Sequence, residues 1–187
     1  MPGISQGLRK LTRTIYELAI PYMLIGGHAL PAYGQIRATQ DIDIAIGAEY
    51  AESVKLQARL RKPGYQLSSL PQPDAPCFFL TDLKNMLEVE IWTKPDGIVF
   101  DKELLRRRIK VRPFDDEFEM FAIGPEDFIA NKLARRDRGV RDEQDAVSVL
   151  SRQKGKLDYT YLENRAKNAG VAEMLMALIE ESRTAPA

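Results

Sequence analysis

The sequence predicts an α+β fold, with a small mixed β-sheet in the first two-thirds of the chain and helices at both ends. Near the N-terminus, Leu8, Leu11 and Ile15 recur at helical spacing after Ser5, a suitable helix cap. The middle of the chain contains short apolar runs separated by turn residues, which is typical of strands. Beyond Gly124 the pattern returns to amphipathic helices, so strands and helices segregate along the chain.

Length and composition narrow the class of protein. The 187 residues suffice to bury a core, and the contents of 44% apolar and 29% charged residues are typical of a globular protein. Basic and acidic residues number 27 each, so no global charge favours nucleic acid or a membrane surface. A single cysteine, Cys77, excludes an intrachain disulfide and a cysteine zinc cluster. Since no apolar run reaches the roughly 18 residues of a membrane span, we expect a cytoplasmic protein without a signal peptide or membrane partner.

The first third of the chain is expected to alternate helices and strands. Pro21 ends the first helix, and Gly26 and Gly27 end the first strand in a turn that a side chain would obstruct. In order, the patterns predict a helix over residues 5–19, a strand over 22–25, a short helix over 28–33, a strand over 38–46 and a helix over 49–61.

The remaining chain is expected to complete the sheet and then become helical. The patterns predict a surface loop over residues 68–76, strands over 77–81 and 86–92, a short helix over 101–108, and a hairpin of strands 109–114 and 118–123 joined by 115–117. Helices follow from 125 and over 141–152, 158–169 and 171–183, with Gly170 as a left-handed stop. We therefore expect a core over residues 1–123 and a C-terminal helical segment over 124–187 packed on it.

Acidic residues alternate with apolar ones in the second and fourth predicted strands. Because successive strand side chains point to opposite faces, Asp41 and Asp43 share one face. Glu90, between Val89 and Ile91, is the best third carboxylate, with Glu88 in reserve on the same face. Carboxylates from two strands suit a pair of hard cations that clamp both oxygens of an in-line displacement at phosphorus.

The Gly26-Gly27 turn supplies a second element of the same chemistry. Glycines at a helix start allow backbone N–H groups to approach phosphate oxygens closely. If the second strand begins early, Arg37 and Thr39 share the Asp41 face, where Arg37 pairs with a phosphate or remains a surface arginine. Glycines for phosphate and carboxylates for magnesium together indicate a nucleoside triphosphate as ligand.

In these residues the chain resembles the nucleotidyltransferases of the polymerase β-like superfamily. Their signature combines a Gly-Gly or Gly-Ser turn, an Asp-x-Asp about ten residues later, and a further acidic residue between apolar ones. The string around the first block looks closest to small AbiEii-type toxins and their relatives. A second block is also similar, formed by Pro125-Glu126-Asp127, Lys132-Leu133, Arg141-Asp142 and Asp145. The resemblance spans roughly residues 22–150, and Glu90 stands where many relatives have aspartate.

The resemblance implies transfer of a nucleoside monophosphate from a nucleoside triphosphate to a hydroxyl or phosphate, with release of pyrophosphate. Asp41 and Asp43 would hold two Mg²⁺ ions, with Mn²⁺ as the alternative metal, and Glu90 would bind the ion that activates the acceptor. Lys132 would approach the triphosphate, a role that the resemblance supports and the spacing does not. The acceptor stays open between tRNA, a protein side chain and a small antibiotic.

Several residues keep two interpretations. His28, the only histidine, either contacts substrate or packs beside the site. The basic residues Arg135 to Arg141 form a solvated face or follow an RNA backbone. Asp142 and Asp145 are expected to pair on a helix rather than bind a ligand.

Four further functions compete with nucleotidyl transfer. One keeps the fold without catalysis, as a nucleotide-binding or antitoxin-like module that binds a protein partner. Another assigns Asp41-Ile42-Asp43 to a glycosyltransferase or a haloacid-dehalogenase-like phosphatase, but Ala45 replaces the threonine of the phosphatase pattern and few residues precede Asp41. A HEPN-type ribonuclease is disfavoured because its Arg-x4-His motif needs a histidine other than His28.

Overall fold

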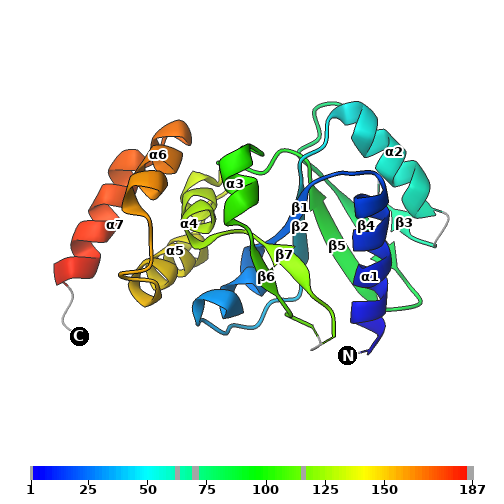
Figure 1. The fold of residues 1–187 in the computed structure, drawn as a ribbon, viewed down its shortest axis with the longest axis horizontal. Coiled ribbons are helices and arrows are strands. Elements are labelled where there is room, and N and C mark those ends of the chain that lie inside the picture. Colours follow the sequence, from blue (N-terminus) through cyan, green and yellow to red (C-terminus); the bar gives the residue numbers. More distant parts are fainter. Residues whose placement is uncertain (1, 62–63, 69–71, 115–116, 185–187) are drawn as a thin grey trace. The chain divides into compact units, whose positions relative to one another are not determined.

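The computed structural model describes residues 2–61, 64–68, 72–114 and 117–184 and confirms the α+β class (Figure 1). Residues 69–71 of the expected loop and 115–116 of the expected hairpin turn lie outside this part. The elements are α1 (Pro2–Glu17), β1 (Tyr22–Ile25), the 3₁₀ helix η1 (Gly26–Tyr33), β2 (Ile42–Ile46), α2 (Tyr50–Arg61), β3 (Gln66–Leu67), β4 (Cys77–Asp82), β5 (Leu87–Trp92), α3 (Lys102–Arg107), β6 (Ile109–Val111), β7 (Met120–Ala122), α4 (Pro125–Ala134), α5 (Val140–Arg152), α6 (Tyr159–Asn168) and α7 (Ala172–Thr184).

The described residues form two compact units that interleave along the chain. Unit 1 comprises Met1–Ala29, Ala38–Pro95 and Arg108–Ala122, and unit 2 comprises Leu30–Arg37, Asp96–Arg107 and Ile123–Ala187. The expected division into residues 1–123 and 124–187 stays a prediction.

Unit 1 is built on a mixed sheet of seven strands in the order β3-β4-β5-β2-β1-β7-β6. β2 runs parallel to β5 and β1 parallel to β7, whereas the other neighbours are antiparallel. The two predicted hairpins are confirmed as β4 with β5 and β6 with β7. β3 escaped prediction because a strand of two residues is too short to show alternation.

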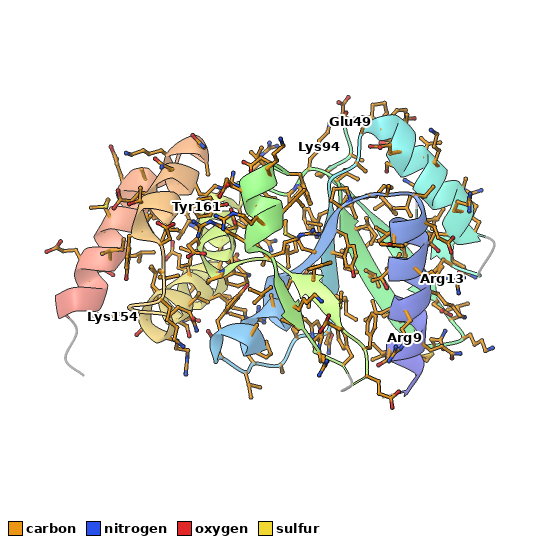
Figure 2. The ribbon with its side chains drawn as sticks, in the orientation of Figure 1. Arg9, Arg13, Glu49, Lys94, Lys154 and Tyr161 are labelled. Atoms are coloured by element: carbon orange, nitrogen blue, oxygen red, sulfur yellow. The ribbon has the colours of Figure 1, made fainter. Side chains whose placement is uncertain are left out.

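Helix α1 covers part of this sheet and contacts β5 and α2. Its predicted apolar stripe is confirmed, since Leu8, Leu11 and Ile15 are fully buried. Arg9 and Arg13, labelled in Figure 2, extend from exposed positions of the same helix, and Arg13 pairs with Glu17 at 3.0 Å. The helix is therefore amphipathic in the way that its sequence period indicates.

The second strand begins later than the sequence indicates. The pattern predicts residues 38–46, but β2 starts at Ile42, and Asp41 precedes it. The partner strand explains the difference: β1 pairs Tyr22 with Ile46 and Ile25 with Asp43, and the chain then turns into η1 at Gly26. β1 therefore has no strand residue to pair with the segment before Ile42.

Unit 2 surrounds helix α4, which contacts α5, α6 and α7. All residues from Glu126 to Leu133 are buried, including the charged Glu126, Asp127 and Lys132. Because α4 is buried on every side, its polar side chains must find partners inside the protein. In the described part of the chain, no helix has both the length and the apolarity that a membrane span requires.

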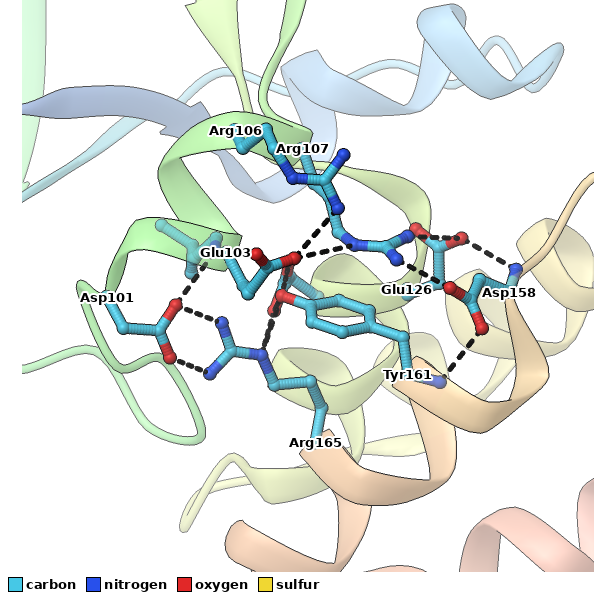
Figure 3. A network of polar contacts seen from close by, with 10 residues as sticks. Asp101, Glu103, Arg106, Arg107, Glu126, Asp158, Tyr161 and Arg165 are labelled. Carbon is cyan, nitrogen blue, oxygen red and sulfur yellow. Dashed lines mark hydrogen bonds and ion pairs between the residues drawn. The ribbon is translucent and has the colours of Figure 1, made fainter.

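Arginine and carboxylate pairs tie the predicted helix α3 to the rest of unit 2 (Figure 3). Arg165 of α6 binds Asp101 with both terminal nitrogens, at 2.7 and 2.8 Å, and its Nε lies 2.9 Å from Asp127 of α4. Arg107 of α3 pairs with Asp158 at 2.5 Å and lies over the Tyr161 ring, 3.9 Å from its centroid. These contacts hold a short helix that has too few turns to be stable by itself.

Candidate active site

The glycine turn contacts the Asp-x-Asp strand directly. Gly26 follows β1 with φ +64°, in the left-handed region that side chains disfavour. A Cβ atom added there would lie 2.0 Å from Oδ2 of Asp43 and 2.8 Å from its Cγ. Gly26 and Gly27 are both buried at the start of η1. Only glycine therefore fits at position 26, and the reason is the carboxylate beside it.

Two of the predicted carboxylates are neighbours on the sheet. Asp43 of β2 and Glu90 of β5 are register partners in the parallel pairing of these strands. Both are half-buried, whereas Glu88 is exposed at the start of its strand. The register places Glu90 beside Asp43, and Gly26 lies against Asp43. That both carboxylates face the glycine turn stays a prediction.

Trp92, one pleat beyond Glu90, binds the same aspartate. Its Nε1–H donates to Oδ1 of Asp43 at a donor–acceptor distance of 3.1 Å. Trp92 pairs in register with Ala45 of β2 on one side and with Cys77 of β4 on the other. Asp43 is thus held between an indole donor and the Gly26 backbone.

The carboxylates also affect the single cysteine. Burial first, and then the charges of Glu90 and Asp43, raise the pKa of the Cys77 thiol. A raised pKa keeps the thiol protonated and weakly nucleophilic at neutral pH. This agrees with the role of Cys77 as a small packed side chain rather than a nucleophile.

Asp41 and Thr39 precede β2 in unit 1. Asp41 is exposed and Thr39 is half-buried. Within the described residues, no group of three or more histidine, cysteine or acidic side chains is arranged to hold a metal ion. The donor set does fit Mg²⁺ chemically, because Asp41, Asp43 and Glu90 offer only hard carboxylate oxygens and two of them are adjacent.

A pocket opens beside Glu90 on the carboxylate side of unit 1. Its volume is about 290 Å³, and its lining includes Asp41, Phe79, Thr81, Glu88 and Glu90. Phe79 is the register partner of Glu90 on β4, and 45% of its surface is exposed. The lining combines three carboxylates, Asp41, Glu88 and Glu90, with the partly exposed ring of Phe79, so it offers both polar and apolar surface.

In unit 2, Lys132 is engaged in buried ion pairs. Its Nζ lies 2.8 Å from Oδ1 of Asp142 and 3.1 Å from Oδ2 of Asp145, and only 4% of its side chain is exposed. Arg37 binds the same Asp145, with Nε 3.2 Å from Oδ1 and Nη2 3.1 Å from Oδ2. Although burial opposes it, hydrogen bonds from Lys132 and the Gly139 backbone lower the pKa of Asp142.

The similarity of this chain to known proteins lies in its fold. No protein-family model matches the chain, and no curated protein is significantly similar to it. Among solved structures, an antigenic nucleotidyltransferase-like protein from Paracoccidioides brasiliensis matches with a TM-score of 0.53 and 17% identity, over 96% of this chain and 93% of that chain. The antibiotic-resistance factor ANT(2'')-Ia matches with a TM-score of 0.54 and 13% identity, over 97% of both chains. The lincosamide antibiotic adenylyltransferase LnuA, bound to lincomycin, matches with a TM-score of 0.48 and 15% identity, over 77% of this chain and 94% of that chain.

This chain has a nucleotidyltransferase-like fold. The likeness covers nearly the whole chain, and at such low identity it establishes the architecture alone. The expected small mixed sheet with flanking and C-terminal helices is thereby confirmed.

Within this nucleotidyltransferase-like fold, sequence reasoning missed two functional contacts. The alternation predicts that Trp92 shares the face of Glu88 and Glu90, but the bond to Asp43 depends on the parallel neighbour strand. Asp145 is expected to pair on a helix and it binds Lys132 of α4, but its bond to Arg37 was not predicted. Neither contact has a local sequence signal, since the partners are far apart in the chain.

The remaining ambiguous residues have partners in the nucleotidyltransferase-like fold. The His28 ring packs against Phe114 at a centroid distance of 5.0 Å, as expected for a packing role. In the basic cluster, Arg135 pairs with Asp137 at 3.0 Å and Arg138 with Glu143 at 3.2 Å. In each pair the arginine is half-buried and its carboxylate partner is exposed, so these two arginines already have partners at the protein surface.

Proposed function

We propose that this protein is a metal-dependent nucleotidyltransferase. It transfers a nucleoside monophosphate from a nucleoside triphosphate to a hydroxyl or phosphate of an acceptor and releases pyrophosphate. One observation carries the proposal: the left-handed Gly26 turn lies against Asp43, and Glu90 is the register partner of Asp43. A phosphate-binding turn beside paired carboxylates is what transfer at phosphorus requires. The likeness in fold supports it, and membership of the AbiEii-type subgroup is part of the proposal.

The residues of unit 1 are proposed to have separate roles in phosphate binding, metal binding and acceptor activation. Backbone N–H groups of Gly26 and Gly27 bind phosphate oxygens, while Asp41 and Asp43 hold two Mg²⁺ ions, or Mn²⁺. Glu90 completes the site on the acceptor side. Bound metal would supply Lewis-acid activation of the acceptor oxygen and charge neutralisation of the leaving pyrophosphate. Asp41 is exposed, so its side chain can turn toward Asp43 at the cost of little more than rotamer entropy.

Three further residues are proposed to contact the nucleotide. Arg37 and Thr39 lie on the segment before β2, and the guanidinium of Arg37 suits a phosphate. Lys132 would contribute as a point charge, which requires it to leave Asp142 and Asp145 or to act from within that cluster. Arg37 is likewise bound to the buried Asp145, so either cation would have to leave a buried carboxylate or act from within the cluster.

The pocket beside Glu90 is proposed to receive the acceptor. Its volume of about 290 Å³ is at the lower end of small-molecule sites. A small hydroxylated compound therefore fits it better than a folded RNA, although a single nucleotide or protein side chain could also enter. All three acceptor classes belong in the first assay.

The decisive assay incubates the protein with Mg²⁺, each radiolabelled nucleoside triphosphate in turn, and cell RNA, cell protein or small hydroxylated compounds. We expect label to appear in one acceptor class, and Asp43→Asn to abolish it by at least about 100-fold because the substitution removes ligand charge at constant volume. Circular dichroism should show an unchanged fold in the variant. Labelling by Asp43→Asn at the wild-type rate would contradict the proposal.

A second candidate is a catalytically silent nucleotide-binding or antitoxin-like module that binds a protein partner. The ion pairs that occupy Lys132 favour it, because they engage a cation predicted to serve the nucleotide. Calorimetry distinguishes the two functions. Nucleotide or partner binding that survives replacement of Asp41, Asp43 and Glu90 together, with no transfer by the wild type, would support the silent module.

A further inference from the structure

We propose that Trp92 is a positioning residue that fixes the carboxylate of Asp43 for metal binding. The inference rests on the proposed function, because it assigns a role to Trp92 within the same site. It starts from the hydrogen bond in which Nε1–H of Trp92 donates to Oδ1 of Asp43 at 3.1 Å. An indole N–H can donate a hydrogen bond but cannot accept one or bind a metal ion. Trp92 therefore bonds to the carboxylate without competing with Asp43 as a metal ligand.

The sheet places the indole where it can reach the aspartate. In the parallel pairing of β2 and β5, Glu90 lies opposite Asp43 and Trp92 lies opposite Ala45, one pleat further along. Ala45 is fully buried, and its small side chain leaves space for the indole to extend diagonally over β2 toward Asp43. A larger residue at position 45 would occupy that space.

On its other side, the Asp43 side chain lies against the backbone of Gly26. Gly26 lies so close that an added Cβ would come within 2.0 Å of Oδ2 and 3.1 Å of the Asp43 Cβ. With Oδ1 bonded to Trp92 and Oδ2 against Gly26, the carboxylate plane has one orientation. Its two oxygens offer about four lone-pair positions, and the bond from Trp92 uses one of them.

Fixing the ligand in advance has a direct chemical benefit. A metal site loses affinity when its ligands must be ordered on binding, and hydrogen bonds from surrounding groups to the ligands prevent that loss. Removing such a group lowers metal affinity or activity by about 10–100-fold in other metal sites. We expect the same range for loss of the indole N–H, with a smaller effect on KM for the nucleoside triphosphate.

Trp92 is the only tryptophan of the chain, which makes the proposal directly measurable. Titration of the wild-type protein with Mn²⁺ alone should quench its tryptophan fluorescence in a saturable way, since the ion would bind beside the indole. Asp43→Asn should abolish the saturable phase. Calorimetric Mn²⁺ binding without any fluorescence change would overturn the proposal.

Variants separate positioning from packing. Trp92→Phe keeps a ring and loses the donor, so we expect about 10–100-fold weaker Mn²⁺ binding by calorimetry and a similar fall in kcat. Trp92→His retains a ring N–H and should recover part of the loss. Equal Mn²⁺ affinity and kcat in Trp92→Phe and wild type would overturn the inference while leaving the proposed function intact.

The wild-type protein supplies the complementary outcome. Absence of Mn²⁺ binding and of nucleotidyl transfer in the wild type would contradict the proposed function and, with it, the role of Trp92. If Trp92→Phe fails to fold, the fluorescence titration of the wild type and Asp43→Asn still tests whether the metal ion binds at Asp43 beside the indole. The single indole N–H resonance gives a second readout, which should shift in Asp43→Asn even without metal.

Discussion

At the scale of single residues, the site depends on how closely Gly26 approaches Asp43. Gly26 combines two restraints: a left-handed backbone at φ +64° and a side-chain carboxylate in the space that a Cβ would need. Gly97 also combines a left-handed backbone, at φ +69°, with a crowded Cβ position, 2.7 Å from the Ala134 Cβ. Some glycines have only the first restraint. Gly155 has φ +86° with no described atom within 4 Å of its added Cβ.

This difference predicts the effects of two matched substitutions. Gly155→Ala should cost about 1–2 kcal/mol of unfolding free energy through left-handed strain alone, without loss of transfer. Gly26→Ala carries the same strain and must also displace Asp43, so we expect a larger loss of stability and loss of transfer. Urea unfolding and the labelling assay measure both. Equal behaviour of the two variants would show that the contact with Asp43 is unimportant.

At the scale of elements, the packing of α4 against α5 depends on a buried cluster of opposite charges. Lys132 on α4 lies between Asp142 and Asp145 on α5, and Asp145 is also bound by Arg37. Removing one partner of a buried ion pair lowers the free energy of unfolding by more than the intact pair contributes to it, because the remaining charge stays desolvated. The sequence suggests a nucleotide-binding lysine here, whereas the contacts indicate a residue that joins two helices.

Lys132→Met tests which description applies. We expect it to lower the unfolding free energy by about 3–5 kcal/mol, since it strands buried carboxylates. Lys132→Met/Asp142→Asn should recover part of that loss, because the asparagine still accepts the Gly139 backbone N–H without a charge. Loss of nucleotidyl transfer at unchanged stability would instead identify Lys132 as a nucleotide contact.

At the scale of the whole molecule, the free energy of unfolding should depend on pH, because folding lowers the pKa of some carboxyl groups and raises that of another. Bonds to Arg165 lower the pKa of Asp101, and bonds to the Tyr161 backbone and to Arg107 lower that of Asp158. Burial raises the pKa of Asp127 to about 6, although Arg165 and the Tyr161 hydroxyl act against it and Glu126 and Asp101 act with it. Asp101 and Asp158 therefore stabilise above their unfolded pKa and lose this contribution as pH falls.

The contribution of Asp127 to stability changes with pH in the opposite direction, and a substitution at this position measures it separately. Its folded pKa of about 6 exceeds the unfolded value of 3.8, so its contribution is complete below pH 3.8 and is lost as pH rises through 6. Relative to Asp127→Asn, the wild type should lose roughly 3 kcal/mol of unfolding free energy between these values. Urea unfolding from pH 4 to 7 measures the difference, and parallel curves for the two proteins would contradict it.

Much of this architecture follows from local patterns. The periods of α1, β1 and the hairpin of β4 and β5 predict those elements closely, because each buries one continuous face. Alternation predicts the strand face from which Asp43 and Glu90 each project, whereas their meeting depends on the register of β2 with β5. The limits of β2 were not predictable, because they depend on where β1 ends.

The sequence by itself determined which residues can perform the chemistry: a glycine turn, alternating carboxylates and the apolar residues that orient them. Only the tertiary structure decided which of these meet. The register of β2 with β5 places Glu90 and Trp92 at Asp43, and the packing of α4 on α5 engages Lys132 with Asp142 and Asp145. The physical reason is that side-chain direction is a local property of a strand or helix, whereas register and ion pairing join residues whose separation along the chain carries no local signal.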